Sequence, residues 1–188
     1  IWISKVARSI ELGHRTLAAL GGLALAWTVG GSLWIYPHSL SYFNELAGGP
    51  RGGHYHLLDS NIDWGQDLHR LKEWHDSHPH ARPLFMNVKN NSYLKQYGLD
   101  YLGPPTGPDE QRLSEYTSVD FGYLGPRPGW YALSVDKLHT RHGGYEYFLE
   151  HFEPTETIGY SIYIYHITPA EANRVRREIG LPAIEVEP

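Results

Sequence analysis

The 188-residue sequence contains no cysteine and a single methionine. Without cysteine the chain can form no disulfide and offers no thiolate for nucleophilic chemistry or zinc binding. Acidic residues outnumber basic ones, which gives a formal net charge of −5 at pH 7. A chain with this charge repels phosphates instead of releasing counterions from them, so nucleic acid is not expected among its partners.

Charged residues are also absent from one long segment, which runs from Thr16 to Asn44. Within it, residues 16–36 form an apolar run, and a helix needs about 20 such residues to cross the hydrocarbon core of a membrane. Trp34 and Tyr36 lie where an interfacial aromatic belt is expected, and Pro37 ends the helix. The sequence therefore predicts a transmembrane helix over residues 16–36.

Two other interpretations of the apolar run stay open. A signal peptide has a shorter apolar region of about 7–15 residues and a small-residue cleavage site, which is not evident here. The run could also form a helix buried in a core. Its many glycines and alanines would let other helices approach closely, so we expect membrane lipid and other transmembrane helices of a parent protein as partners. The chain begins with Ile1, and we expect it to be a fragment of that parent.

Basic residues precede the apolar run, since Lys5, Arg8 and Arg15 stand against Glu11 alone. By the positive-inside rule, residues 1–15 form a cytoplasmic flank and the chain after the helix lies outside. We divide the remainder into a linker, residues 37–53, and an extracytoplasmic domain, residues 54–188. The expected location is the inner (cytoplasmic) membrane, with the domain on its periplasmic side.

Strand and helix patterns alternate along residues 54–188, which predicts an α/β fold with a mostly parallel or mixed sheet. Strands are expected at residues 54–59, 83–88, 99–102, 130–135 and 157–168. Helices are expected at residues 66–76, 92–97, 145–151 and 169–179. Residues 157–168 give the strongest strand signal because they are rich in β-branched and aromatic side chains. The long Pro/Gly-rich stretch 103–129 is expected to cover a face of the domain or to carry function.

The densest polar cluster follows the first expected strand, where open α/β sheets bind ligands. Its candidate substrate- or acceptor-binding residues are Asp59, Asn61, Asp63, Trp64, Gln66 and Asp67.

Three interpretations of this cluster stay open. Its oxygens could bind Ca²⁺ through Asp59, Asn61, Asp63 and Asp67, although the glycine comes one position late for a calcium loop and no Glu occupies the twelfth position. Trp64 and Gln66 could instead hold a sugar by stacking and hydrogen bonding. Alternatively, Asp63 caps the following helix and the other side chains satisfy turn backbone.

Other aromatic and histidine patterns have structural interpretations. The strand at 157–168 carries Tyr160, Tyr163 and Tyr165, which are expected to pack in the sheet, with a carbohydrate-stacking surface as the alternative. Residues 75–80 contain three histidines that could ligate a metal but read as an exposed helix-end loop. His139 is expected to be solvated.

Two strings in the sequence are more specific than these patterns. Residues 42–50 read Tyr-Phe-Asn-Glu-Leu-Ala-Gly-Gly-Pro, and residues 59–67 read Asp-Ser-Asn-Ile-Asp-Trp-Gly-Gln-Asp. Following an apolar helix, and supported by residues 129–135 and 159–165, they resemble the C-terminal end of bacterial polytopic membrane glycosyltransferases. The family is the phospholipid-carrier-dependent GT-C class related to protein mannosyltransferases and aminoarabinose transferases. The resemblance covers residues 16 to about 168.

The resemblance implies a transferase that takes a lipid-linked sugar, carried on polyprenyl phosphate, at the outer membrane face. In that family the catalytic acidic residues lie in the first extracytoplasmic loop, which nothing here matches, so no catalytic residue is carried over. This chain is then expected to be a non-catalytic part that shapes the active-site cavity or holds the acceptor. No cofactor is expected in this chain, although the parent enzyme could need a divalent cation.

Two alternatives to that function remain. The chain could be a self-contained single-pass anchored module that binds sugar or calcium. It could also be a free-standing α/β enzyme that uses the loop at residues 59–67.

Overall fold

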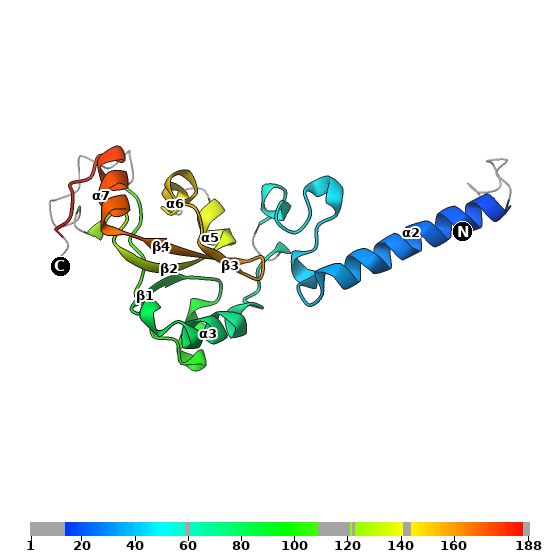
Figure 1. Cartoon of the computed structure of the whole chain (residues 1–188), viewed down its shortest axis with the longest axis horizontal. Helices are drawn as coiled ribbons and strands as arrows, with labels where there is room; N and C mark the ends of the chain where they lie inside the picture. Colours follow the sequence, from blue (N-terminus) through cyan, green and yellow to red (C-terminus); the bar gives the residue numbers. More distant parts are fainter. Residues whose placement is uncertain (1–13, 59–60, 109–120, 122, 141–143, 186–188) are drawn as a thin grey trace.

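A long helix that projects from a mixed α/β domain dominates the computed structural model, which describes residues 14–58, 61–108, 121, 123–140 and 144–185 (Figure 1). This helix, α2 (His14–Ile35), ends just before Pro37, as the sequence predicts. Within the described chain, its segment Thr16–Ile35 alone has the length and composition to cross a membrane, and only 6% of its most apolar stretch is buried. This exposure rules out a helix buried in the core of this domain.

Four short strands form a single mixed sheet in the order β1-β2-β4-β3. They are β1 (Leu84–Asn87), β2 (Gly129–Ser134), β3 (Glu156–Ile158) and β4 (Ile162–Ile167). β1 and β2 are parallel, with Leu84 opposite Trp130, whereas β4 runs antiparallel to both β2 and β3. The α/β class is confirmed, and of the two sheet arrangements that the sequence left open, mostly parallel or mixed, the structure has the mixed one.

Helices cover both faces of this sheet (Figure 1). α3 (Leu68–Ser77) lies on one face, and α5 (Val135–His139) and α6 (Glu146–His151) lie on the other. α7 (Pro169–Glu178) follows β4, and its start is fixed by a capping box in which Thr168 and Glu171 bond each other's backbone N–H. The 3₁₀ segments η5 (Pro79–Ala81) and η6 (Asn91–Tyr97) pack beside α3.

The apolar core has two halves, one on each face of the sheet. Alternate residues of β2 divide between them, with Ala132 on the α3 side and Tyr131 and Leu133 on the α5–α6 side. The α3 half also buries Leu68, Leu71, Leu84, Met86, Leu94 and Ile164. The α6 half also buries Leu138, Tyr147, Phe148, Tyr165 and Val175.

Three sequence predictions of strands are wrong or only partly met. Residues 54–59 form no strand where described, because η3 (Gly53–Tyr55) turns the chain and His54 packs on His139 instead of pairing with a strand. Residues 157–168 are two strands, because Gly159 with φ +59° turns the chain into a hairpin. Of 99–102, only Leu102 bridges Phe85. The short helix α5 was not predicted.

The linker at residues 37–53 is a chain of 3₁₀ turns packed on the end of the domain. η1 (Ser39–Ser41) follows α2, and in η2 (Glu45–Ala47) the Asn44 side chain accepts a hydrogen bond from the backbone N–H of Ala47. Gly48, with φ +82°, ends that turn. The string at residues 42–50 therefore has a local structural explanation, because it forms a capped turn that leads the chain away from α2.

Candidate functional site

The predicted loop before α3 divides into buried acids and exposed or half-buried neighbours. Asp63 and Asp67 are each only 1% exposed, whereas Trp64 is 62% exposed. Asn61 donates to the carbonyl of Leu58, which is a turn contact. Gln66 closes the loop, since its amide donates to Ile62 O at 2.9 Å and its carbonyl accepts from Trp64 N at 2.8 Å. Asp59 lies outside the described residues.

Asp63 is a buried acid with one oxygen used and one unused. Its Oδ1 accepts a hydrogen bond from Gly65 N at 2.7 Å, whereas Oδ2 has no hydrogen-bond partner in the described part of the chain. Burial, with smaller effects of the Asp67 and Asp136 carboxylates, raises the pKa of Asp63 to about 6. Asp63 therefore satisfies turn backbone at Gly65, and the interpretation that it caps α3 is wrong, because the N-cap position belongs to Asp67.

Asp67 joins three parts of the chain. Its Oδ2 accepts a hydrogen bond from Ser161 Oγ at 2.8 Å, in the turn between β3 and β4. Its Oδ1 lies 3.4 Å from His38 Nδ1 in the linker and 3.9 Å from Arg70 Nε on α3. The His38 ring meets the edge of Tyr160 at 5.3 Å. Asp67 therefore holds the linker against the β3–β4 turn.

The calcium interpretation finds no assembled ligand set in the structure. Across the described residues, no three His, Asp or Glu side chains come together in a way that could hold a metal ion. The Asp67 carboxylate already contacts Ser161 and His38, and the Asn61 amide donates to a backbone carbonyl. The side chains that the structure brings together here connect parts of the fold.

Asp63→Asn is expected to raise the free energy of unfolding by about 2 kcal/mol at pH 7 to 8 and to leave it nearly unchanged below pH 4. The folded acid keeps its proton up to about pH 6, against an ordinary value of 3.8. Between these values the folded state binds more protons than the unfolded state, so the wild type loses stability as the pH rises. Chemical unfolding across pH 3 to 8 measures this.

A neighbouring acid supplies a control of opposite sign. The Lys72 ammonium lowers the pKa of Asp76, which lies exposed on α3. Asp76→Asn should therefore lose stability relative to wild type above about pH 4. A gain of similar size in both variants would show that removing any negative charge from α3 or the loop before it stabilises the chain, and that the burial of Asp63 is not the cause.

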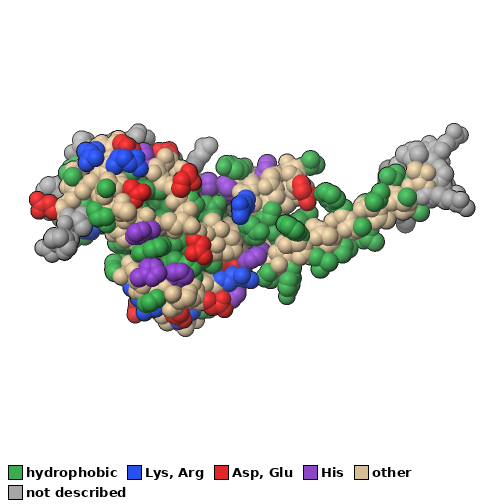
Figure 2. Space-filling view, in the orientation of Figure 1, with side chains coloured by type: hydrophobic (Ala, Val, Ile, Leu, Met, Phe, Trp, Pro, Cys, Tyr) green, Lys and Arg blue, Asp and Glu red, His purple; other side chains and the backbone are tan. Residues whose placement is uncertain are grey.

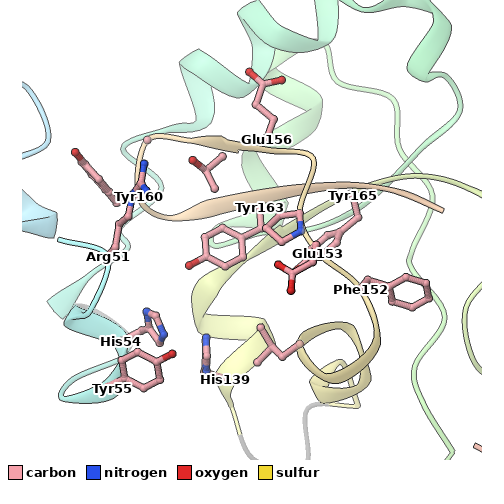
Figure 3. A pocket seen from close by; sticks show the side chains of 14 residues that line it. Arg51, His54, Tyr55, His139, Phe152, Glu153, Glu156, Tyr160, Tyr163 and Tyr165 are labelled. Atoms are coloured by element: carbon pink, nitrogen blue, oxygen red, sulfur yellow. The ribbon is translucent and has the colours of Figure 1, made fainter. Parts of the chain in front are cut away.

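A cavity of about 620 Å³ opens on the opposite side of the β3–β4 turn (Figure 3). The linker gives one wall, the β3–β4 hairpin a second, and the ends of α5 and α6 the others. Its main lining side chains are Arg51, His54, Tyr55, His139, Phe152, Glu153, Glu156, Thr157, Tyr160, Tyr163 and Tyr165. We call this cavity the junction pocket.

Two stacked histidines close the lower wall of the junction pocket (Figure 3). The rings of His54 from η3 and His139 from α5 are 4.2 Å apart, and Tyr55 packs against His54 at 4.1 Å. Burial, together with the neighbouring His54, lowers the pKa of His139 to about 4. The expectation that His139 is solvated is therefore wrong, because the unforeseen packing of the linker covers it.

Tyr163 and Tyr165 form the floor of the junction pocket, since alternate residues of β4 face the same side. Tyr165 is 1% exposed, and its hydroxyl has no hydrogen-bond partner among the described residues. Burial and the nearby Glu153 carboxylate raise its pKa. Tyr163 is half-buried beside Arg51. These tyrosines thus pack in the sheet, as the sequence predicts, and also line a cavity, whereas the carbohydrate-stacking alternative stays a prediction.

The predicted loop and the junction pocket lie on either side of one turn. Gly159 and Tyr160 line the pocket, and a Cβ added at Gly159 would overlap the carboxylate of Asp67. Asp67 is therefore a positioning residue behind the pocket wall, and it does not line the pocket itself. The pocket residues 51–55 and 139 carried no recognisable signal, because only the tertiary packing of the linker brings them together.

A second aromatic group lies over the β1–β2–β4 end of the sheet, where histidines gather (Figure 2). Its rings pack in a row, with Trp74 on His78 at 4.5 Å and Trp130 on His166 at 4.4 Å. His80 meets Trp130 at 5.5 Å. Half-buried His78 and exposed His80 thus follow the end of α3, as the sequence predicts, whereas His75 is buried within that helix.

Comparison with models of protein families, with curated proteins and with solved structures finds no match to this chain.

Proposed function

We propose that this chain is the C-terminal, non-catalytic part of a membrane glycosyltransferase that uses a sugar donor linked to polyprenyl phosphate. In this proposal the domain lies on the extracytoplasmic side of the inner membrane and holds the acceptor. The observation that carries it is the position of the junction pocket, which lies at the end of the domain joined to α2 because Arg51, His54 and Tyr55, which follow α2, line it. With α2 in the membrane, a ligand in this pocket would lie close to the lipid surface, where a lipid-linked sugar arrives.

The exposed surface of α2 supports the membrane part of this proposal. Leu23, Trp27 and Trp34 are 66% to 86% exposed, and the helix is green over much of its length in the space-filling view (Figure 2). Apolar side chains exposed along a helix need lipid or other helices around them. The parent's other transmembrane helices and membrane lipid are therefore the partners proposed for α2.

The two strings that resemble the transferase family support the proposal because both shape the same junction. Asn44 and Gly48 of the first string form the capped turn of the linker, which continues into the pocket wall. Asp67 of the second string holds that linker against the β3–β4 turn. Both strings thus contribute to a shaped junction between an apolar helix and a pocket.

The absence of cysteine allows a clean test of the topology. Ser92 is exposed in η6, and Ser92→Cys puts the first thiol into the chain. In intact bacterial cells, this thiol should react fully with a membrane-impermeant maleimide. Lys137→Cys on α5 is a half-buried site of the same domain that should react more slowly. Labelling of Ser92→Cys only after cell lysis would place the domain in the cytoplasm and contradict the proposal.

Activity is tested in membranes that contain the full-length protein to which this chain belongs. With polyprenyl-phosphate sugars as donors, Tyr163→Ala should reduce transfer at least tenfold at subsaturating acceptor, mainly through a higher KM, because Tyr163 lies in the pocket floor. Tyr93→Ala removes an equally aromatic but exposed residue outside the pocket and should leave transfer unchanged. Absence of transfer by the folded wild-type protein with every such donor would contradict the proposal.

One observation favours a second candidate function, a self-contained anchored sugar-binding module. In the described part of the chain, the linker, the β3–β4 hairpin and the α5–α6 region together line the junction pocket. Such a module would bind its ligand in the same pocket but would belong to a protein without transfer activity. The transfer assay above separates the two functions.

A further inference from the structure

We infer that the junction pocket is a binding site for a neutral carbohydrate, whose ring packs on Tyr163 and whose hydroxyl groups pair with Tyr165 and Glu153. The inference rests on the proposed function in one respect, since it names the ligand class of the site proposed to hold the acceptor. It is carried by the size of the cavity, by its aromatic rings, by the unpaired hydroxyl of Tyr165 and by the nearby Glu153 carboxylate.

The cavity has the size of a site for a small molecule. Its volume of about 620 Å³ lies within the range of about 300–1,000 Å³ that is common for ligand pockets. Three separate segments line it, the linker, the β3–β4 hairpin and the α5–α6 region (Figure 3). The wall nearest the linker is held in place by the Asp67 contacts to Ser161 and His38. A ligand of a few rings would therefore meet walls that are already formed.

Aromatic rings supply the apolar surface of the junction pocket. Tyr163 and Tyr160 are half-buried in the hairpin, and Phe152 lines the pocket beyond the end of α6, with its ring packed on Phe148. Tyr55, on the linker, is 79% exposed at the edge. A sugar ring has a face of C–H groups that packs on such rings, while the tyrosine hydroxyls stay available for its polar edge.

Polar groups inside the pocket can form further hydrogen bonds. Tyr165 Oη is buried and has no partner among the described residues, although a buried hydroxyl normally has one. Glu153 lies near it and can accept hydrogen bonds from ligand hydroxyls (Figure 3). Glu156 is already bonded by Trp74 Nε1 at 2.7 Å. A wholly apolar ligand would leave Tyr165 unpaired, whereas a hydroxylated ring pairs with it.

The charges in the junction pocket favour a neutral ligand over an anion. Arg51 brings one positive charge, and Glu153 and Glu156 bring two negative ones. The stacked rings of His54 and His139 add none near pH 7, because burial lowers the pKa of both. A phosphate would meet Arg51 but also two carboxylates, whereas sugar hydroxyls can donate to a carboxylate and accept from a guanidinium.

The test uses the full chain in phosphatidylcholine nanodiscs, titrated with neutral trisaccharides of glucose, mannose and galactose and followed by saturation-transfer NMR. At least one trisaccharide should bind. Tyr163→Ala and Tyr165→Phe should each weaken that binding at least fivefold, and Tyr93→Phe, outside the pocket, should not change it. Tyr165→Phe should also leave the thermal midpoint of the unbound chain unchanged or higher, because it removes a buried unpaired hydroxyl.

Three results would overturn the inference. The first is that none of the trisaccharides binds the folded chain. The second is that binding to Tyr163→Ala and Tyr165→Phe is the same as to wild type. The third is that inorganic pyrophosphate binds where the trisaccharides do not and that Arg51→Gln abolishes this binding, which would make the pocket an anion site. Trisaccharide binding without any sugar transfer by the parent protein would count against the proposed function alone. Transfer without trisaccharide binding would count against this inference alone.

Discussion

Replacing Arg176 with methionine is expected to lower the free energy of unfolding by about 3–5 kcal/mol. Arg176 lies on α7 and is completely buried. Its guanidinium donates hydrogen bonds to backbone carbonyls of Phe121, Leu124 and Pro182. Methionine fills a similar volume but donates nothing, so these carbonyls would lose their partners. Thermal unfolding of the full chain in detergent, followed by near-UV circular dichroism, measures the loss.

The adjacent residue gives a matched control for Arg176. Arg177 is exposed on the same helix, so Arg177→Met should change stability by less than about 0.5 kcal/mol. Arg176→Lys should fall between the two, because a single ammonium cannot reach carbonyls that a guanidinium fork reaches in several directions. If Arg176→Met lowered the free energy of unfolding as little as Arg177→Met, the buried hydrogen bonds of Arg176 would not contribute to stability. Only the interaction of its charge with the helix dipole would remain.

Replacing Asp67 with alanine is expected to cost about 2–4 kcal/mol and to release the linker from the hairpin. The variant leaves the buried hydroxyl of Ser161 without its acceptor and removes the carboxylate beside His38. Unfolding experiments give the stability, and limited proteolysis should show faster cleavage within residues 37–53. Glu73→Ala, an exposed acid on α3, is the control and should change neither readout.

The contact between Asp67 and the hairpin can be tested from the other side. Gly159→Ala adds a Cβ where the Asp67 carboxylate lies, at a φ of +59°. Gly180→Ala also has a positive φ, +76°, but its Cβ would meet nothing within 4 Å. The first variant should therefore lose more stability than the second by about 1–3 kcal/mol, the usual cost of overpacking. Equal losses would mean that backbone strain alone explains both, and that the turn does not press on Asp67.

Much of the secondary structure could be predicted because its signals are local. The apolar run that ends before Pro37, the strand at 130–135 and the helix after Thr168 depend on periodicity, proline and caps within a few residues. The hairpin within 157–168 was missed because Gly159 lies inside an otherwise continuous β-branched and aromatic run. The helix α5 was missed because its five residues are too few for a periodic pattern.

The candidate site was predicted only in part, for a physical reason. The sequence indicated the polar loop because Asp63 and Asp67 are close together in it. Both are buried, however, and Asp67 accepts a hydrogen bond from a residue 94 positions away. Asp67 proved to be next to the junction pocket, but as a support of its wall. Trp64 and Gln66, expected to contact a sugar, lie in the loop and do not line the pocket.

The sequence by itself determined the long uncharged apolar helix, the α/β class and most of the elements, since each follows from composition and from spacing along a few turns or strands. The tertiary structure alone decided the mixed sheet, the burial of Arg176 and the junction pocket. The pocket needs His54 from the linker beside His139 from α5, and such pairs form only when distant segments pack. Long-range packing of this kind leaves no periodic trace in the sequence, because each partner is a single residue whose neighbour is chosen by the fold.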